Sequence, residues 1–333
     1  MKAIVCTRYG PPEALRLAEV DKPVPGDDEV LVEVHASSVT WATVALVTGK
    51  PLVARLMAGG LRKPKYRIPG GDLAGRVEAV GRDVKQFRPG DEVFGDMGDS
   101  GFGTFAEYVC VPENTIARKP ANVSFEEAAA VGQAAVVALQ GLRDEGKVRP
   151  GQKVLIYGAS GGIGTFAVQL ARYFGAEVTG VCSTRNLAMV RSIGADHVID
   201  YTKEDFTKNG QHYDLILATA GYRSIFDYRR ALSPSGTYVA IGGAIAQVFQ
   251  PIFLGPLISM TGSKKLSTLS HKINQKDLAF IKELLEAGKI KPVIDRSYTL
   301  SEVPEALRYY GGGHVRGKVA ITVNHNDKQM EVK

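Results

Sequence analysis

The sequence predicts an α/β protein in which a compact, barrel-like β domain is followed by a doubly wound parallel sheet. Short strand-like runs bounded by Gly or Pro fill the first third of the chain. Near residue 124 the pattern changes to strands that alternate with helices. The segment 153–170 joins an apolar strand to an amphipathic helix through a glycine-rich turn. A chain of 333 residues is long enough for two such domains.

The β-rich part is expected to contain strands at residues 2–7, 30–34, 73–80 and 92–94. Ser124 and Glu127 then form a capping box, and the helix that it opens is expected to run through 128–143.

The alternating part is expected to supply the parallel sheet. Its strand candidates are 153–157, 177–182, 197–199, 213–218 and 236–241, and its helix candidates are about 162–174, 186–193, 223–232 and 275–287. A strand at 297–300, a helix after Ser301 and a strand at 318–323 are expected to rejoin the first domain. The expected domains are therefore 1–123, completed by 290–333, and 124–289.

The glycine-rich turn has the form of a pyrophosphate site. Gly158, Gly161, Gly162 and Gly164 lie between a strand that ends at Tyr157 and the following helix. Small residues let the backbone approach the phosphates, and the first amides of the helix point toward negative charge. A tight turn without a ligand is the alternative. The position of the glycines between a strand and a helix favours a dinucleotide-binding site.

The second strand of the predicted sheet is not followed by the acidic residue that usually binds the adenosine ribose. No Asp or Glu occurs between Glu177 and Asp196, whereas Ser183, Thr184 and Arg185 follow the strand. Hydroxyl groups and a guanidinium group suit a 2′-phosphate, so the sequence predicts NADPH rather than NADH. The alternative for Arg185 is a solvated residue in the first turn of the next helix.

Charge and cysteine content argue against several classes of protein. The 41 basic and 35 acidic residues give a formal charge of +6, and the one basic cluster, within 55–67, lacks the interleaved aromatic residues of a nucleic-acid site. Cys6, Cys110 and Cys182 form no C-x-x-C pair, which argues against a cysteine-rich zinc lobe and a disulfide framework. Without a recognisable secretion signal or membrane span, a cytoplasmic protein is expected.

Six segments match the pattern of one known family. They are residues 69–81 (PGGDLAGRVEAVG), 87–93 (FRPGDEV), 103–108 (GTFAEY), 158–164 (GASGGIG), 194–201 (GADHVIDY) and 313–318 (GHVRGK). Together they resemble the medium-chain dehydrogenase/reductase superfamily, in its zinc-independent, quinone oxidoreductase-like branch. The resemblance implies a GroES-like β-barrel domain plus a Rossmann domain, and a homodimer as in many members.

The resemblance also bears on metal binding. Zinc-dependent relatives carry a His-Glu pair where this chain has Gly71 and Asp72, and no cysteine lies near residues 37–40. The six histidines show no metal-ligand spacing, so no catalytic metal is expected.

The family pattern implies a set of cofactor-binding residues. Ser160, Gly161, Gly162 and Ile163 are expected at the pyrophosphate, and Ser183, Thr184, Arg185 and Tyr201 at the 2′-phosphate. Ala218, Thr219 and Ala220 are expected beside the nicotinamide ribose, and Ile241, Gly242 and Gly243 beside the nicotinamide amide. Arg316 and Lys318 are expected to reach the cofactor from the returning C-terminal segment, with a surface turn as the alternative.

The chain departs from its relatives where the substrate is expected. Thr40 and Thr43 stand where relatives often have Asn and Asp, and the sole tryptophan, Trp41, lies between them. These changes are either neutral or the mark of a reshaped pocket. Gln133 and Tyr222 are the first candidates to donate hydrogen bonds to a substrate carbonyl, followed by Thr40 and Thr43, with Trp41 as an apolar wall.

The leading prediction is NADPH-dependent hydride transfer, without zinc, to an activated C=C bond in a quinone or α,β-unsaturated carbonyl compound. One alternative is carbonyl reduction to an alcohol, for which Tyr222 is the favoured proton donor. Another is an NADPH-binding protein whose reshaped pocket has non-redox or lost activity. The expected partner is thus an apolar small molecule and a second copy of the chain, with neither nucleic acid nor membrane.

Overall fold

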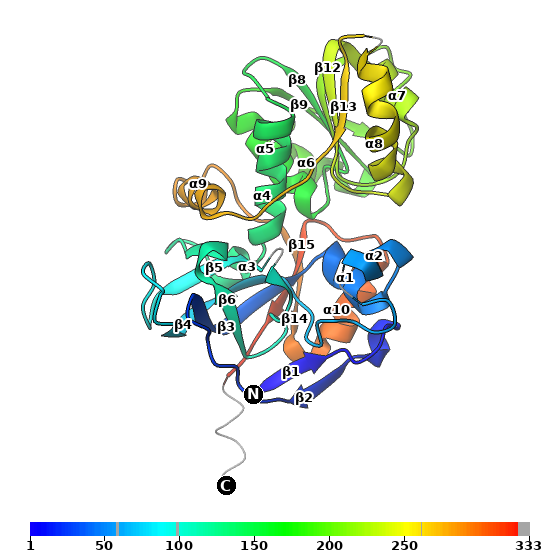
Figure 1. The fold of residues 1–333 in the computed structure, drawn as a ribbon. Helices are drawn as coiled ribbons and strands as arrows, with labels where there is room; N and C mark the ends of the chain where they lie inside the picture. Colours follow the sequence, from blue (N-terminus) through cyan, green and yellow to red (C-terminus); the bar gives the residue numbers. More distant parts are fainter. Residues whose placement is uncertain (58–59, 98–99, 261, 326–333) are drawn as a thin grey trace. The chain divides into compact units, whose positions relative to one another are not determined.

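The computed structural model describes residues 1–57, 60–97, 100–260 and 262–325, which form two compact units (Figure 1). The first unit comprises Met1–Gln133, Lys272–Ala287 and the C-terminal segment from Pro292, and the second comprises Ala134–His271 and Gly288–Lys291. The first is rich in antiparallel strands and the second contains a parallel sheet, which confirms the predicted fold class.

The first unit is built around a sheet of seven strands and a separate pair. Its strands are β1 (Lys2–Val5), β2 (Arg16–Glu19), β3 (Glu29–Val39), β4 (Asp72–Val80), β5 (Glu92–Asp96), β6 (Tyr108–Pro112), β7 (Ile116–Arg118), β14 (Ile294–Thr299) and β15 (Lys318–Thr322). β1 pairs with β2, and the larger sheet has the order β14-β15-β3-β4-β5-β7, with β6 also paired with β3. Its core includes Val32, Leu73 and Ile321, which are all fully buried.

Several helices of the first unit begin at a residue whose side chain caps them. They are α1 (Trp41–Thr48), α2 (Leu52–Met57), α3 (Phe125–Ala129), α9 (Gln275–Glu286) and α10 (Val303–Gly311). The Thr40 hydroxyl caps α1 by accepting from the Thr43 amide at 3.2 Å. The capping box of Ser124 and Glu127 at the start of α3 is present as predicted.

The second unit contains one parallel sheet of six strands. Its strands are β8 (Lys153–Tyr157), β9 (Glu177–Cys182), β10 (His197–Asp200), β11 (Tyr213–Ala218), β12 (Leu232–Ala240) and β13 (Lys265–Thr268), in the order β10-β9-β8-β11-β12-β13. Its helices are α4 (Gly132–Gln140), α5 (Gly162–Tyr173), α6 (Leu187–Ser192), α7 (Ile225–Ala231) and α8 (Ile245–Met260). The chain enters this unit within α4.

The strand order fixes where a ligand can bind in the second unit. From β8 the chain runs outward to β9 and β10, and it then crosses to β11 and continues in the opposite direction. Right-handed crossovers in opposite directions place their helices on opposite faces, so α5 and α7 cover different faces of the sheet (Figure 1). The crevice of such a sheet opens at the carboxyl ends of the two middle strands, here β8 and β11.

The structure differs from the sequence expectation in several elements. The helix expected over 128–143 is divided, because α3 ends at Ala129, α4 begins at Gly132, and the turn Gly141–Glu145 is π-helical. Helix α8, which contains two prolines, was not expected. Helices α3 and α9 both belong to the first unit. In the described part of the chain, no helix is long and apolar enough to cross a membrane.

Candidate functional site

The turn between β8 and α5 is shaped to hold a phosphate group. Gly158 has a φ of +88°, and a Cβ at Gly164 would lie 2.1 Å from the Gly158 carbonyl oxygen, so only glycine lets α5 pack this closely. Gly161 is the N-cap and brings no side chain to the first amides of α5. A Cβ at Gly161 would meet no atom closer than 3.5 Å, which leaves open space beside the helix N-terminus.

A buried amide links this turn to the loop after β9. Asn186 is 4% exposed, and its Nδ2 donates to Ser160 Oγ at 3.0 Å and to Ser183 Oγ at 3.3 Å. Its Oδ1 has no hydrogen-bond partner among the described residues. A buried acceptor without a partner is costly, so this atom fits a ligand that brings a hydroxyl or amine donor, as an adenosine group does. The structure thus brings Ser160 and Ser183 together, through a residue that the sequence analysis missed.

The other residues expected at the 2′-phosphate lie at the ends of β9 and β10. Arg185 and Tyr201 are both exposed. The Thr184 hydroxyl donates to the Asp200 carboxylate, which also accepts from Thr202 Oγ1 at 2.7 Å. The bond from Thr184 is the main reason why the pKa of Asp200 lies below its ordinary value. Asp200 lies outside the acid-free segment of the sequence, and only the fold brings its carboxylate to this loop.

The loops after β11 and β12 contact one another at the carboxyl ends of these strands. The amides of Ile241 and Gly242 donate to the Ala218 carbonyl oxygen at 2.8 and 3.2 Å. Thr219 Oγ1 donates to the Tyr157 carbonyl oxygen at 3.0 Å, which ties the first loop to the end of β8. The predicted segments 218–221 and 241–243 therefore lie side by side, next to the glycine turn.

Gln247 of α8 fixes both of these loops. Its side chain is 1% exposed, and its Nε2 donates to the carbonyl oxygens of Ala220 at 3.0 Å and Gly242 at 2.8 Å. Its Oε1 accepts from Tyr228 Oη at 2.6 Å and from the Arg223 amide at 3.2 Å. These four bonds use the full capacity of the side-chain amide. No sequence pattern marks Gln247, because the two prolines within α8 hide the helix that carries it.

Tyr222 lies in the loop after β11 and is 54% exposed. Its Oη accepts from Gln250 Nε2 at 3.4 Å, and Gln250 Oε1 accepts from the Ile225 amide at 2.7 Å. Helix α8 therefore holds the loop at a second point. No acceptor for the Tyr222 proton is found within the described ranges, so this hydroxyl can still donate to a substrate.

In the first unit, a buried carboxylate joins four segments of the chain. Asp72 at the start of β4 is fully buried and accepts from the Gln133 amide at 2.8 Å, from Lys318 Nζ at 2.9 Å and from the Ser38 hydroxyl. Lys318 is 4% exposed, so the ion pair is buried as well. Burial raises the pKa of the neighbouring Tyr310 to about 12, and the charge of Asp72 adds to this effect.

The candidate donors of the first unit are already hydrogen-bonded. Gln133 Nε2 donates to Asp96 Oδ2 at 3.4 Å. Thr40 and Thr43 are buried, with their hydroxyl oxygens 3.1 Å apart. Trp41, the first residue of α1, is 52% exposed. The fold thus places Thr40, Trp41 and Thr43 at the start of one helix and Gln133 at the start of another.

Arg316 and Lys318, the remaining expected cofactor residues, belong to the first unit. The Arg316 amide donates to Asp295 Oδ2 at 2.9 Å, and its Nε lies 3.7 Å from the other carboxylate oxygen. Its side chain is half exposed, whereas that of Lys318 is directed to Asp72. The two side chains therefore have different surroundings, although they are two positions apart in the sequence.

Comparisons with known proteins identify the family. Residues 26–121 match the family described as alcohol dehydrogenase GroES-like domain, and residues 193–321 match the family described as zinc-binding dehydrogenase. The chain is 33% identical to a mitochondrial NAD(P)H oxidoreductase from Mus musculus over 97% of this chain and 89% of that protein. It is also 33% identical to 2-methylene-furan-3-one reductase from Solanum lycopersicum over 96% of this chain and 79% of that protein. The chain belongs to the medium-chain dehydrogenase/reductase superfamily.

A solved structure confirms the fold and the branch of this medium-chain dehydrogenase/reductase. The quinone oxidoreductase from Coxiella burnetii has a TM-score of 0.87 and 30% sequence identity, with 97% of this chain and 99% of that chain covered. The chain therefore lies in the quinone oxidoreductase-like branch, as the sequence segments indicated, and its β-rich unit is of the GroES-like type.

Asp72 forms a buried ion pair with a lysine. Lys318 Nζ lies 2.9 Å from Asp72 Oδ2 and supplies the positive charge beside this carboxylate. Among the residues that the structure describes, no group of three or more His, Cys, Asp or Glu side chains is placed to hold a metal ion. The donor set around Asp72 therefore suits an ammonium group better than a zinc ion.

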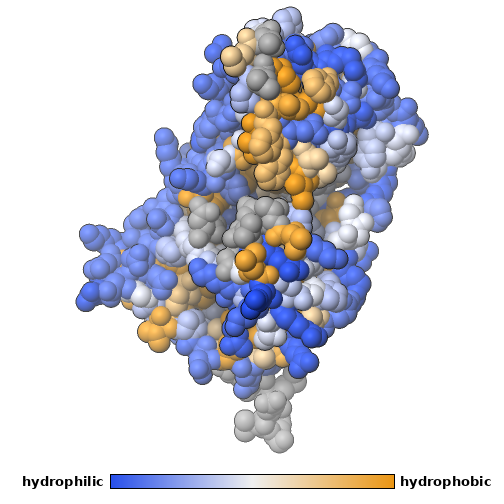
Figure 2. Space-filling view, turned by 45° about the vertical axis from the view of Figure 1, so that its right-hand side comes forward, coloured by the Kyte–Doolittle hydropathy of each residue, from blue (hydrophilic) through white to orange (hydrophobic). Residues whose placement is uncertain are grey.

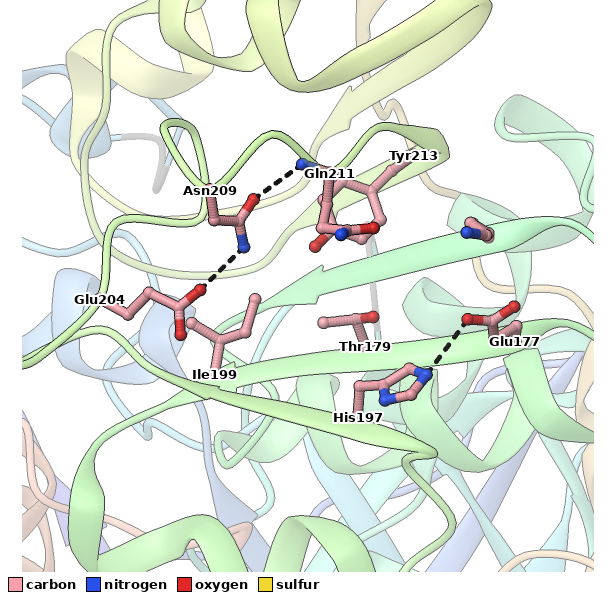
Figure 3. Close-up of a pocket in the computed structure, with 9 residues that line it drawn as sticks. Glu177, Thr179, His197, Ile199, Glu204, Asn209, Gln211 and Tyr213 are labelled. Atoms are coloured by element: carbon pink, nitrogen blue, oxygen red, sulfur yellow. Dashed lines mark hydrogen bonds and ion pairs between the residues drawn. The ribbon is translucent and has the colours of Figure 1, made fainter.

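A cavity of about 350 Å³ lies on the parallel sheet, and none of the predicted site residues lines it. It is lined by Lys153, Glu177, Thr179, His197, Ile199, Glu204, Asn209, Gln211 and Tyr213. Figure 3 shows that its polar side chains pair with one another: His197 Nε2 lies 3.2 Å from Glu177 Oε1, and Asn209 donates to Glu204 at 2.9 Å. Lys153, Glu177, His197 and Tyr213 are the first residues of β8, β9, β10 and β11, whereas open parallel sheets bind ligands at the carboxyl ends of their strands. These four residues therefore lie at the opposite ends of their strands from the glycine turn that follows β8.

Proposed function

We propose that the protein is an NADPH-dependent oxidoreductase that needs no zinc and transfers hydride to an activated C=C bond. The substrate class is a quinone or an α,β-unsaturated carbonyl compound. The single observation that carries the proposal is the glycine turn that leaves the N-terminus of α5 open, beside the paired loops after β11 and β12. Membership of the superfamily supports an NAD(P)H oxidoreductase, and the names of the relatives include a quinone oxidoreductase and an enone-type reductase.

The preference for NADPH rests on the loop after β9. When bound, the cofactor supplies the hydride, and the protein has to orient it and exclude water. Ser183 and Arg185 offer a hydroxyl and a positive charge to a 2′-phosphate. Asp200, the carboxylate in this region, is hydrogen-bonded to Thr184 and Thr202.

The chain's own contribution to the reaction is a set of hydrogen-bond donors. Hydride addition to the β-carbon places negative charge on the carbonyl oxygen, so a donor at that oxygen lowers the barrier. Tyr222 is the foremost candidate, because its proton has no acceptor among the described residues. Gln133 is the second, because one N–H of its amide remains beside the bond to Asp96.

The test is a substrate panel for the full-length protein, in which NADPH oxidation and product identity are both measured. We expect quinones and enones to be reduced at the C=C bond or quinone ring, NADPH to be preferred, and activity to survive exhaustive chelation. Formation of an alcohol from a saturated aldehyde would favour the carbonyl-reductase alternative. Cofactor binding without turnover across the panel would favour a non-redox role, and equal use of NADH would contradict the cofactor preference.

Variants separate the two candidate donors. Tyr222→Phe and Gln133→Leu each remove one donor and keep the approximate shape of the side chain. If either donates to the developing oxyanion, its loss is expected to lower kcat about a hundredfold. Phe226→Leu in the same region, at an exposed side chain, is the control. Unchanged turnover in the double variant would remove both residues from the mechanism.

We also propose that the protein is a homodimer, as the family resemblance implies. Strand β13 ends the parallel sheet and pairs only with β12 among the described residues. Exposed apolar side chains of α8 lie on the same part of the second unit, and Figure 2 shows apolar residues gathered there. An unpaired strand edge beside apolar surface is the usual place for a second copy to add.

The three free cysteines agree with the proposed cytoplasmic location.

A further inference from the structure

Asn186 is the most buried polar residue of the loop after β9. Its hydrogen bonds determine which groups of the neighbouring serines are already engaged. Its Nδ2 has two protons, which go to Ser160 Oγ and Ser183 Oγ. A serine oxygen can accept while its own proton is donated elsewhere. No acceptor for either serine proton is present within the described ranges. Both protons thus remain available to a ligand.

Thr184 has the opposite arrangement. Its hydroxyl proton is donated to Asp200, whose other bonds come from the amide and hydroxyl of Thr202. A hydroxyl that is engaged in this way can accept from a ligand but has no proton left for a phosphate oxygen. Thr184 was among the residues expected at the 2′-phosphate, and its bond to Asp200 argues against that role.

We propose that Asn186 is a positioning residue for the adenosine end of the cofactor. By donating to Ser160 and Ser183, it directs their hydroxyl protons outward, to the pyrophosphate and to the 2′-phosphate respectively. Its Oδ1, which is buried and has no hydrogen-bond partner among the described residues, accepts from a hydroxyl or amine of the adenosine. The inference rests on the proposed NADPH-dependent function and adds the residue that determines how strongly the 2′-phosphate is recognised.

The physical reason is the strength of a hydrogen bond to an anion. A bond from a hydroxyl to a phosphate oxygen is charge-assisted and stronger than one between neutral groups. Without the amide of Asn186, each serine hydroxyl is free to turn toward a neighbouring carbonyl oxygen or water. The serine would then have to be reoriented when the cofactor binds, at a cost in affinity.

The test compares two ligands that differ only in the 2′-phosphate. Binding of 5′-AMP and of adenosine 2′,5′-bisphosphate to the full-length protein is measured by calorimetry. The Kd of 5′-AMP divided by the Kd of the bisphosphate is the 2′-phosphate discrimination. Asn186→Leu and Ser183→Ala are each expected to lower this ratio about tenfold, which corresponds to one hydrogen bond to a charged group. Ser192→Ala on α6 is the matched control, because within the described part of the chain its hydroxyl bonds only to the Met189 carbonyl oxygen.

A double variant tests whether Asn186 acts through Ser183. If it does, Ser183→Ala with Asn186→Leu shows no lower discrimination than Ser183→Ala alone. Fully additive losses would overturn the proposal, since a merely structural role predicts independent effects. Thr184→Val is expected to lower the ratio less than Ser183→Ala, and an equal or larger loss would also overturn it.

A second substitution covers the case in which Asn186→Leu does not fold. Asn186→Asp keeps the shape but accepts the serine protons instead of donating to the serines, so it is expected to weaken binding of the bisphosphate more than binding of 5′-AMP. Wild-type discrimination in a folded Asn186→Asp variant would overturn the inference and leave the proposed function intact. If the wild-type protein binds both ligands equally, the NADPH proposal itself fails, and the inference fails with it.

Discussion

At the scale of single residues, the structural roles of glycines could be predicted from the sequence, whereas those of side-chain amides could not. A glycine between a strand and a helix has its role fixed by local geometry, as Gly158 and Gly164 show. Asn186 and Gln247 act through partners that are 26 and 27 residues away in the chain, Ser160 and Ala220. No local pattern marks such residues, because the fold alone brings their partners together.

Two glycines of the turn are expected to respond differently to the same substitution. A Cβ at Gly164 would lie 2.1 Å from backbone, so Gly164→Ala is expected to lower the free energy of unfolding by about 1–3 kcal/mol. A Cβ at Gly161 meets nothing closer than 3.5 Å and its φ is −85°, so Gly161→Ala is expected to change stability by less than about 0.5 kcal/mol.

The same pair distinguishes packing from ligand binding. The methyl group of Gly161→Ala would occupy the open space at the N-terminus of α5, so this variant is expected to bind NADPH about tenfold more weakly or worse. Thermal unfolding and a fluorescence titration with NADPH measure the two effects separately. Normal NADPH affinity in Gly161→Ala would mean that the phosphate does not lie against this turn.

At the scale of elements, buried strands were predicted more accurately than helices. Strands β8, β9 and β11 have the predicted bounds, because each is a short apolar run that ends at a turn or loop residue. Helix α8 was missed because Pro251 and Pro256 lie inside it, and a proline in a sequence normally argues against a helix interior. The bond from Gln247 to both loops is a consequence of α8 that sequence patterns do not express.

The ion pair of Asp72 and Lys318 is expected to hold β4, β15 and the start of α4 together. Asp72→Asn or Lys318→Met leaves one buried charge without its partner, so each is expected to lower the free energy of unfolding by about 3–5 kcal/mol. The double variant leaves no unpaired charge. Its free energy of unfolding is expected to fall by less than the sum of the two single losses. Because Trp41 is the only tryptophan and lies in the first unit, its fluorescence follows unfolding of this unit.

An exposed ion pair in the same unit supplies the control. Arg82 and Asp27 are 2.7 Å apart, with side chains 77% and 58% exposed, so Arg82→Met is expected to change stability by about 1 kcal/mol or less. Additive losses in the double variant of Asp72 and Lys318 would show that the two side chains stabilise the unit independently.

At the scale of the whole molecule, the chain forms two compact units, and its segments Lys272–Ala287 and from Pro292 onward belong to the first. Helix α9 belongs to the first unit because Gln275 Nε2 donates to the Glu113 carbonyl oxygen at 2.8 Å and Asn122 Nδ2 donates to that of Leu285 at 3.0 Å. These bonds join residues more than 160 positions apart. A domain boundary depends on such long-range contacts, which hydrophobic periodicity does not reveal.

The proposed homodimer is a property of the molecule that its surface allows us to test. A two-fold axis pairs a strand edge with itself in antiparallel orientation, so two copies of β13 would join their sheets into one. Ile252 of α8 is 51% exposed and lines a hollow beside β13, so a charge introduced there would lie in the interface. Ile252→Glu is therefore expected to convert the dimer to a monomer, because a buried unpaired carboxylate opposes association.

Val24→Glu is the control, since Val24 is 86% exposed in the first unit and its substitution is expected to leave the dimer intact. Sedimentation velocity measures the mass of each form. A monomeric wild-type protein, or a dimeric Ile252→Glu variant, would show that β13 and α8 do not bind a second copy.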